Sequence, residues 1–342
     1  MYWYEKKPRE GGIVLSTRVR FARNLEGVPF PAGLGEKERS EVFARVKEAF
    51  REKDPMAVDF GETEDRVKQA YVQTHLASAA LAKGGKGTGL LLSRDGDVSV
   101  MVNEEDHVRL QVILTGKAIR PAFDKAMEWM LVGENALNFA YRDGLGYLTH
   151  CPTNLGAAMR LSVMIHLPAV VETGAMNPLI RRLNDAGFTV RGLFGEGSRE
   201  GGNIFQISNQ MSRERTPEEI VEAFGKVILQ VEELEKNAKE ALMKASPLHR
   251  EDRVFRALGL LKYARKMSYS EFISLYSDLR FGKEAGMDLP RETEQLDRLF
   301  IDLMPAPMLL RDGSLADEDA RDAARSRILR ETLKERSEEH AS

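Results

Sequence analysis

The sequence predicts an α+β fold: an antiparallel sheet flanked by helices, followed by an all-α C-terminal domain. Short strand-like stretches recur between residues 12 and 209 of the 342-residue chain, and helical patterns interrupt them. After Thr216 the apolar residues recur at three- and four-residue spacing almost without a break, which is the period of helices. We therefore expect a mixed domain over residues 1–245 and a helical domain over residues 246–342.

The first part of the chain supplies a strand, two helices and then several strands. Residues 12–21, GIVLSTRVRF, are β-branched and apolar until arginines interrupt them, which indicates a strand that runs into a site. Residues 36–53 and 64–83 have the apolar spacing of helices, and a glycine-rich stretch then breaks the chain. Residues 89–114 predict successive strands joined by an Asp-Gly hairpin turn.

The remaining patterns complete the sheet and then form the helical domain. A helix is expected from about Lys117 to Tyr141, and another around residues 178–186. Four short stretches predict further strands: GYLTHCP (146–152), RLSVMIHLP (160–168), FTVRGLF (188–194) and NIFQISN (203–209). A helix start at Thr216-Pro217 opens the helical part, whose later patterns cover residues 246–282, 291–310 and 315–336.

Composition excludes several classes of protein. The chain has 50 Lys and Arg against 53 Asp and Glu, a formal net charge of −3, so it lacks the basic excess of a nucleic-acid binder. Its single cysteine, Cys151, excludes an internal disulfide framework. No apolar run approaches the roughly 18 residues of a membrane span, and the N-terminus MYWYEKKPRE has no signal-peptide core, which predicts a cytoplasmic protein without membrane contact.

Five arginines lie in strand-like or turn contexts instead of on helix faces: Arg18, Arg20, Arg109, Arg160 and Arg191. Residues i and i+2 of a strand point to the same side, so Arg18 and Arg20 project together. Guanidinium groups stay charged and bind phosphate oxygens in pairs, so several converging arginines suit a nucleoside triphosphate. Taken alone, each arginine also fits a surface salt bridge.

Three carboxylates accompany these arginines. Glu104 and Glu105 follow a strand-like stretch, and Glu196 lies in a glycine-rich turn where backbone can approach a ligand closely. Acids beside arginines suggest charge of both signs in one site, although a Glu-Glu pair also fits an exposed strand end. Cys151 follows a short strand, and the residue type alone fits either a buried small side chain or a reactive thiol.

Four motifs in register resemble the phosphagen (guanidino) kinases, such as creatine and arginine kinases. They are VLSTRVRFARN, VNEEDHVR, CPTNLGAAMRLSV and VRGLFGEGSREGGNIFQISN, which together span roughly residues 12–210. The resemblance implies transfer of the ATP γ-phosphoryl group to a guanidinium group, with ATP and Mg²⁺ as cofactors. It also assigns the charge around Glu105 to the floor of the catalytic site.

Two departures indicate the branch of this family. The VLSTRVR segment begins almost at the N-terminus, without the small helical domain that precedes it in phosphagen kinases, and a helical extension containing RDAAR (321–325) follows the kinase motifs. This arrangement resembles the bacterial protein-arginine kinases, which phosphorylate arginine side chains and mark proteins for a Clp protease. The resemblance implies protein substrates, an activator protein, a Clp protease or a repressor as partners, no direct contact with nucleic acid, and a homodimer or higher oligomer.

Two other functions remain open at this point. One is a small-molecule guanidino kinase, which activity on free arginine or creatine would support. The other is a catalytically weak adaptor that binds phosphoarginine and represses a partner; the intact acids Glu105 and Glu196 and the five arginines argue against it.

The resemblance also implies a role for each matched residue. The nucleotide site would comprise Ser16, Thr17, Arg18, Val19, Arg20, His75, Arg109, Arg160, Leu161, Ser162, Val163, Met164, Arg191 and Gly192. Glu105 would grip the guanidinium and act as base, Glu104 would face the water shell of the metal, Glu196 would be the second clamp, and Cys151 the active-site cysteine; no side chain would ligate the metal directly. Asp106 and His107 would hold the loop. Arg321, Asp322 and Arg325 would bind phosphoarginine as a regulatory site, with Ser326 standing where alanine is expected.

Overall fold

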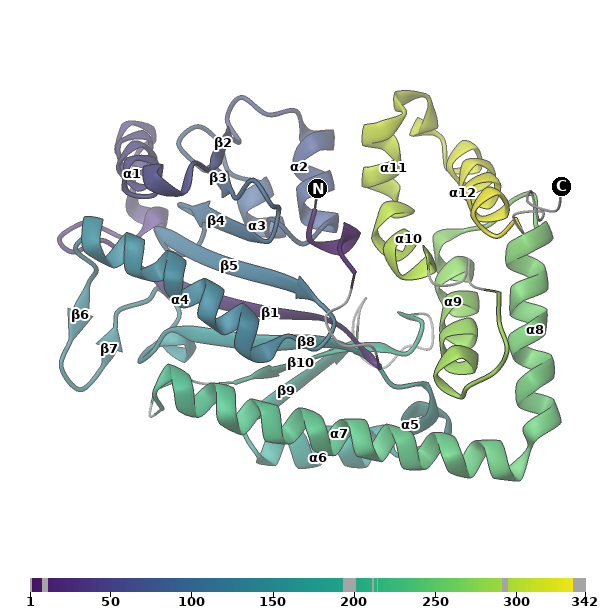
Figure 1. The fold of residues 1–342 in the computed structure, drawn as a ribbon. Coiled ribbons are helices and arrows are strands. Elements are labelled where there is room, and N and C mark those ends of the chain that lie inside the picture. The colour runs from purple at the N-terminus through teal and green to yellow at the C-terminus, as the bar shows by residue number, and fades with distance from the viewer. Residues whose placement is uncertain are drawn as a thin grey trace, which may run out of the picture. The chain divides into compact units, whose positions relative to one another are not determined.

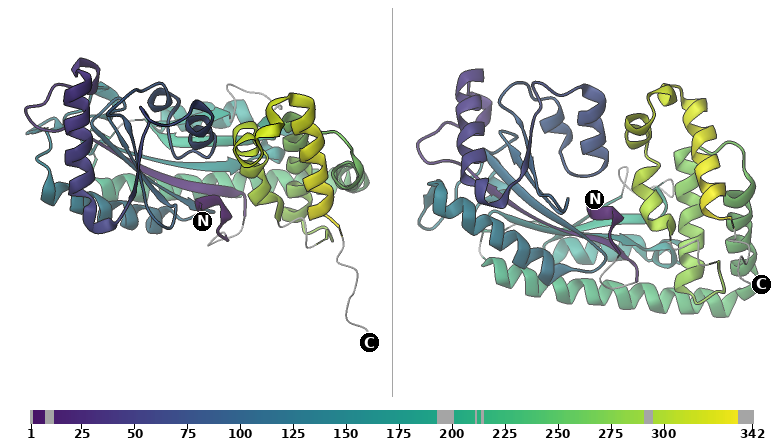
Figure 2. Two further views of the ribbon diagram at one scale, coloured as in Figure 1. Left: turned by 90° about the horizontal axis from the view of Figure 1, so that it is seen from above. Right: turned by 45° about the horizontal axis from the view of Figure 1, so that its top comes forward.

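The computed structural model of the chain describes residues 2–7, 12–192, 201–210, 212–213, 215–290 and 295–334. These residues form two compact units. The first comprises Met1–Met164, Arg182–Val190 and Gln206–Leu229, and the second comprises Ile165–Arg181, Arg191–Phe205 and Gln230–Ser342. The long helix α7, Pro217–Ala245, contributes residues to both units, with the division after Leu229. Figure 2 shows α7 as one long, continuous helix.

An eight-stranded sheet forms the centre of the mixed part of the chain (Figure 1). Its strands are β1 Val14–Arg23, β2 Met56–Asp59, β3 Gly89–Leu92, β4 Val98–Val102, β5 Val108–Thr115, β8 Met159–His166, β9 Phe188–Gly192 and β10 Ile204–Asn209. They are ordered β2-β3-β4-β5-β1-β8-β10-β9, and a separate two-stranded sheet joins β6 Tyr141–Arg142 to β7 Gly146–Tyr147. The pairs from β2 to β1 are antiparallel, which confirms the predicted sheet.

Helices flank this sheet and make up the C-terminal part. The α-helices are α1 Glu36–Ala49, α2 Asp65–Gln73, α3 Ala79–Ala82, α4 Ile119–Ala136, α5 Pro168–Glu172, α6 Met176–Asp185, α7 Pro217–Ala245, α8 Pro247–Tyr263, α9 Tyr269–Glu284, α10 Leu296–Asp302, α11 Pro305–Arg311 and α12 Glu318–Thr332. Short 3₁₀ turns are η1 Trp3–Glu5, η2 Pro31–Gly33, η3 Arg51–Lys53, η4 Pro152–Asn154 and η7 Gly313–Ala316. The fold class predicted from the sequence is therefore confirmed. Helix α7 ends at Ala245 and α8 begins at Pro247, so the helical structure is interrupted where the domain boundary was expected. The boundary itself stays a prediction.

Strand β1 separates an apolar face from a charged one. Val19 and Phe21 are buried on one side, where the Thr17 hydroxyl accepts a hydrogen bond from the N–H of Ala118 at the start of α4. Arg18 and Arg20 point to the other side because side chains alternate along a strand. The sheet thereby gains a packed core under α4 and leaves its opposite face available for a site.

One predicted helix is wrong. Residues 64–83 form two helices, α2 and α3, instead of one, because the backbone turns at His75 and Ser78 caps a new helix. The Thr74 hydroxyl donates to the carbonyl of Ala70, and the Ser78 hydroxyl accepts from the N–H of Leu81 at the start of α3. Between them His75 adopts a φ of 62°, which no helix contains. GYLTHCP is also mostly irregular, with only the two residues of β7 in a strand.

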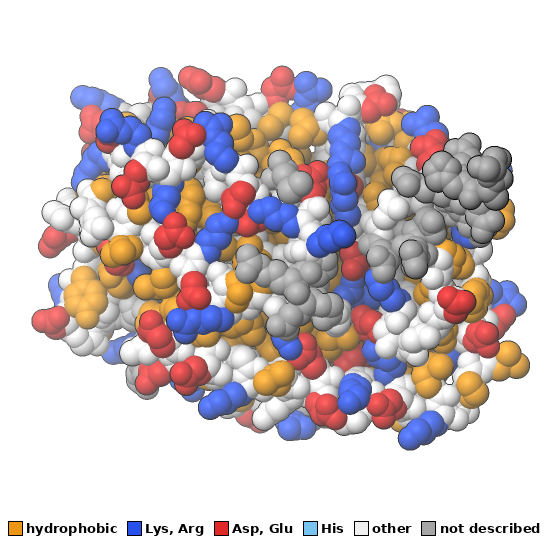
Figure 3. Space-filling view, viewed as in Figure 1, with side chains coloured by type: hydrophobic (Ala, Val, Ile, Leu, Met, Phe, Trp, Pro, Cys, Tyr) orange, Lys and Arg blue, Asp and Glu red, His pale blue; other side chains and the backbone are white. Residues whose placement is uncertain are grey.

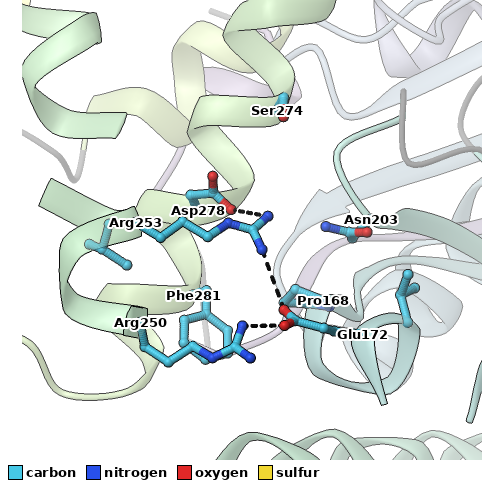
Figure 4. Close-up of a pocket in the computed structure, with 10 residues that line it drawn as sticks. Pro168, Glu172, Asn203, Arg250, Arg253, Ser274, Asp278 and Phe281 are labelled. Carbon is cyan, nitrogen blue, oxygen red and sulfur yellow. Dashed lines mark hydrogen bonds and ion pairs between the residues drawn. The ribbon is translucent and has the colours of Figure 1, made fainter. Parts of the chain in front are cut away.

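The second unit has an apolar core between α8 and α9 and a pocket of about 250 Å³. Arg250 pairs with Glu172, and Arg253 pairs with both Glu172 (3.4 Å) and Asp278 (2.7 Å) at the edge of this pocket (Figure 4). Two positive and two negative side chains thus neutralise one another. The pocket therefore presents no uncompensated charge to a ligand.

The surface has charge of both signs. On the face shown in Figure 3, Lys and Arg side chains are interspersed with Asp and Glu, in keeping with the net charge of −3. Within the described residues, no helix is both long and apolar enough to cross a membrane.

Candidate active site

Four of the five predicted arginines lie together on the charged face of the sheet. The register places Arg20 opposite Gln111 and Ala22 opposite Arg109, so Arg20 and Arg109 are diagonal neighbours across β1 and β5. Burial and the positive charges of Arg109 and Arg160 lower the pKa of Arg18 to about 10. Burial, together with repulsion from Arg18, Arg109 and Arg160, lowers the pKa of Arg20 well below its ordinary value. The cluster is therefore under electrostatic strain.

An anion would relieve that strain. In the part of the chain that the structure describes, no ion pair involves Arg18 or Arg20, and the buried Nε of Arg20 has no hydrogen-bond partner. The charge of Glu104 stabilises the Arg20 guanidinium. Partly buried guanidinium groups of this kind suit ligands with several negative oxygens, phosphate groups above all.

Glu104 anchors one arginine of the cluster. Its side chain is 3% exposed, forms an ion pair with Arg109, and accepts hydrogen bonds from the Ser78 hydroxyl (2.5 Å) and the N–H of Glu105 (2.9 Å). Burial alone would raise the pKa of Glu104, but the charge of Arg109 and these hydrogen bonds hold the pKa below its ordinary value. Glu104 is thus a fixed anion that orients Arg109, and its predicted role at a metal water shell stays a prediction. Ser78 was not predicted as a site residue, although its N-cap position is visible in the sequence.

Glu105 is the carboxylate that remains accessible. Its side chain is 33% exposed, with Oε2 lying 3.7 Å from Nη1 of Arg109 and Oε1 lying 3.6 Å from Nδ1 of His150. It therefore adjoins the arginine cluster and still faces solvent, where a cationic group can reach it.

A buried polar network holds the loop that carries both glutamates. Asp106 accepts hydrogen bonds from the Asn24 amide (2.6 Å) and from the N–H of His150 (2.8 Å). Asn24 in turn accepts from the N–H of His107 (3.0 Å), whose ring accepts from the N–H of Leu25 (3.1 Å). Burial is the main cause that lowers the pKa of His107, which keeps that ring neutral. Asp106 and His107 support the loop in the way expected from the sequence.

Asp106→Ala should destabilise the protein by about 2 kcal/mol, because it leaves the buried Asn24 amide and the His150 N–H without their acceptor. Urea unfolding measures the effect, with Asp143→Ala at an exposed hairpin position as the control. Equal transition midpoints for the two variants would show that Asp106 does not hold the loop.

Cys151 lies directly after this support. The N–H of His150 is fixed by Asp106, and the Thr149 hydroxyl donates to the carbonyl of Cys151 (2.9 Å). The Cys151 Sγ lies 3.0 Å from the Thr153 hydroxyl, and the residue is only partly buried. The thiol is thus a hydrogen-bonded, accessible group, and its chemical role stays a prediction.

His75 lies close enough to the cluster for its titration to depend on Arg18. Burial and then the charge of Arg18 lower the pKa of His75 to about 4, so the ring is neutral at physiological pH. Its buried Nε2 has no hydrogen-bond partner among the described residues. A neutral ring beside the arginines agrees with its predicted place at the nucleotide, which stays a prediction.

Several predicted nucleotide residues point away from the arginine face. Four of them have side chains buried on the opposite side of their strands: Thr17 and Val19 in β1, and Leu161 and Val163 in β8. Strand alternation turns these four side chains into the core, so their backbone is the part that can line a nucleotide on the arginine face, and their place at the nucleotide stays a prediction. Their backbone stays available, and Ser16, Ser162 and Met164 share the faces of Arg18 and Arg160.

The remaining predicted residues are less constrained by the structure. Arg160 donates to the Ser208 hydroxyl (3.2 Å) across β8 and β10. Arg191, which is exposed, and Gly192 end β9, and their place at the nucleotide stays a prediction. Glu196 lies outside the described residues.

The predicted phosphoarginine site is internally bonded. Arg325 is 1% exposed and donates to the carbonyls of Leu303 (3.1 Å) and Met267 (2.7 Å), and it forms an ion pair with Asp322. Arg321 donates to the carbonyl of Leu315 (3.0 Å). Phosphoarginine binding here stays a prediction, and it requires Asp322 to release Arg325.

Ser326 takes part in the same packing. Its hydroxyl donates to the carbonyl of Arg265 (2.6 Å), a bond that the expected alanine cannot make. The helix α12 is therefore fastened to the α8–α9 connection at this position.

The arginine cluster suits phosphate oxygens, and the accessible carboxylate of Glu105 beside it suits a cationic group. These side chains define a phosphotransferase whose acceptor is cationic. The model of the ATP:guanido phosphotransferase C-terminal catalytic domain matches residues 37–238, and that of the protein-arginine kinase McsB C-terminal domain matches residues 247–342. The chain is 38% identical over 341 residues to the protein-arginine kinase of Bacillus pumilus, covering 97% of this chain and 93% of that protein. It is 36% identical over 340 residues to that of Bacillus subtilis, with the same coverage. The chain belongs to the protein-arginine kinases of the ATP:guanido phosphotransferase family.

Solved structures show the same fold. Lombricine kinase is 19% identical with a TM-score of 0.59, covering 67% of this chain and 68% of that one. The duplicated taurocyamine kinase from Schistosoma mansoni, with bound transition-state analogue components, is 24% identical with a TM-score of 0.59; the match covers 65% of this chain and 33% of that duplicated one.

Proposed function

We propose that the protein transfers the γ-phosphoryl group of ATP to arginine side chains of other proteins, and that the phosphoarginine formed marks these proteins for a Clp-type protease. The observation that carries the proposal is the strained cluster of Arg18, Arg20, Arg109 and Arg160 next to the accessible carboxylate of Glu105. A polyphosphate neutralises the cluster, and a guanidinium neutralises Glu105.

The arginines do the electrostatic part of the work. Phosphoryl transfer asks a protein mainly for in-line positioning and for stabilisation of the charge on the transferred group. Arg18, Arg20 and Arg160 hold the phosphate oxygens, and Glu104 keeps Arg109 aimed at them. Mg²⁺ would enter with ATP and keep phosphate and water ligands, with Glu104 at its water shell; when bound it neutralises charge on the β- and γ-phosphates.

Glu105 does the acid–base part. A guanidinium is a poor nucleophile because it stays protonated, with a pKa above ~12. Glu105 orients it through paired hydrogen bonds and accepts the proton of the attacking nitrogen as the N–P bond forms and the bond to the ADP oxygen breaks. The proton then passes from Glu105 to solvent. Glu196 would be the second clamp, and the Cys151 thiol would contribute charge beside the guanidinium.

The choice of acceptor separates this proposal from a small-molecule guanidino kinase. Comparison of kcat/KM for an unfolded protein such as casein with that for free arginine and creatine tests it. We expect turnover on the protein and little on the free compounds. A preference for free arginine or creatine would instead favour the small-molecule kinase.

We further propose that phosphoarginine binds at Arg321, Asp322 and Arg325 and couples the helical domain to catalysis or to assembly. Arg321→Ala with Asp322→Ala should abolish binding of a phosphoarginine peptide, measured by calorimetry on a Glu105→Gln background, and should leave ATP affinity unchanged. Because Asp322 is the ion-pair partner of the buried Arg325, thermal unfolding of the double variant must be recorded alongside. Equal peptide affinity in a folded double variant would place the binding site elsewhere.

Partners follow from the same proposal. Substrate proteins with accessible arginines are required. An activator protein, a Clp protease or a repressor, and further copies of the chain in a homodimer or higher oligomer complete the proposed set.

A further inference from the structure

His150 is the other group that faces the accessible carboxylate of Glu105. Its Nδ1 lies 3.6 Å from Oε1 of Glu105, while Nη1 of Arg109 lies 3.7 Å from Oε2. Each oxygen of the carboxylate therefore has one nitrogen beside it. None of the four kinase motifs assigns a role to His150, which directly precedes Cys151.

The backbone and the ring of His150 are both held in place. Its N–H donates to the buried Asp106 (2.8 Å), so its backbone is tied to the loop that carries Glu105. Its ring meets the ring of Phe30 edge to face, with centroids 5.7 Å apart and planes at 88°. The side chain is 49% exposed, so these contacts and not burial hold the ring beside Glu105.

The charged and titratable groups described around this ring differ in what they can do. They are Glu105 in front of it, Arg109 beyond Glu105, Asp106 behind its N–H, and Cys151 next in the chain. Arg109 is already paired with Glu104, so its guanidinium is shared between the two carboxylates. The imidazole of His150 lies at the other oxygen of Glu105.

We infer that His150 is a positioning residue for Glu105. Paired hydrogen bonding to a guanidinium requires the carboxylate plane to be set in advance. Nδ1 of His150, 3.6 Å from Oε1, and Nη1 of Arg109, 3.7 Å from Oε2, flank the carboxylate on both sides, limit its rotation and so set that plane. The inference rests on the proposed role of Glu105.

Two substitutions test the positioning role. His150→Ala removes the nitrogen beside Oε1, so KM for an unfolded protein substrate should rise about tenfold while KM for ATP stays within about twofold. His150→Asn keeps a polar N–H group near the position of Nδ1. It should restore most of the substrate KM, which a purely structural role of the imidazole ring does not predict.

The experiment measures steady-state kinetics with protein substrate and ATP varied separately. The control is His249→Ala, an exposed histidine of α8, which should match the wild type. A wild-type substrate KM in His150→Ala would overturn the inference, and so would an equal rise in the KM for ATP, because that indicates general damage to the site. Glu105→Gln is measured in parallel. If Glu105→Gln still transfers phosphate, the proposed role of Glu105 is wrong. If Glu105→Gln is inactive while His150→Ala behaves like the wild type, only the inference about His150 is wrong.

Discussion

Glu105→Gln is expected to lower kcat by roughly 10²–10⁴-fold, the range that a positioned general base contributes. The amide has nearly the shape of the carboxylate but cannot accept the proton of the guanidinium or offer it two anionic oxygens. The dissociation constant for ATP should change little, because Arg109 is held by Glu104 and not by Glu105 alone. Steady-state kinetics and ATP calorimetry on the same preparation measure the two quantities.

The matched control is Glu62→Gln, an exposed glutamate outside the site, which should retain wild-type kcat. A loss of ATP affinity in Glu105→Gln as large as the loss of kcat would contradict the assignment of Glu105 to the guanidinium.

Arg160→Ala is expected to weaken ATP binding by roughly 10- to 100-fold, which corresponds to one or more charge-assisted hydrogen bonds. The value of kcat should fall as well, because the Arg160 guanidinium contacts phosphate in both the ground state and the transition state. Arg160→Lys should recover only part of either quantity, because an ammonium group cannot make the paired contacts of a guanidinium. Thermal unfolding without ATP should be unchanged or shifted upward, since one positive charge has left the cluster around Arg18 and Arg20.

Arg160 is a better test than Arg109, whose removal would leave the buried Glu104 without its ion-pair partner and lower stability as well as binding. Arg142→Ala, at an exposed position of β6, is the control. Wild-type ATP affinity in Arg160→Ala would show that this residue does not hold phosphate.

The fold and the arginine cluster could be predicted because both depend on local periodicity. Alternation along residues 14–23 places Arg18 and Arg20 on one face whatever the rest of the chain does. The same alternation turns the side chains of Thr17 and Val19 into the core, which leaves their backbone to line the predicted nucleotide site.

The supporting contacts could not be predicted because they join residues that are distant in the sequence. The Asn24–Asp106 hydrogen bond spans 82 positions, and the Ser78–Glu104 bond spans 26. Arg325 shows the same limit: a charged residue on a late helix suggests a solvated face, yet the structure buries it against two backbone carbonyls and Asp322. Only tertiary packing supplies those partners.

The most direct test of the central claim is mass spectrometry, at neutral pH, of an unfolded protein incubated with ATP and the enzyme, because P–N bonds are labile in acid. We predict phosphoryl groups on arginine side chains, absent when Glu105→Gln replaces the wild type and lost after acid treatment. Phosphoryl groups found only on serine, threonine or tyrosine, or none on the protein while ATP is consumed with free arginine, would contradict the account.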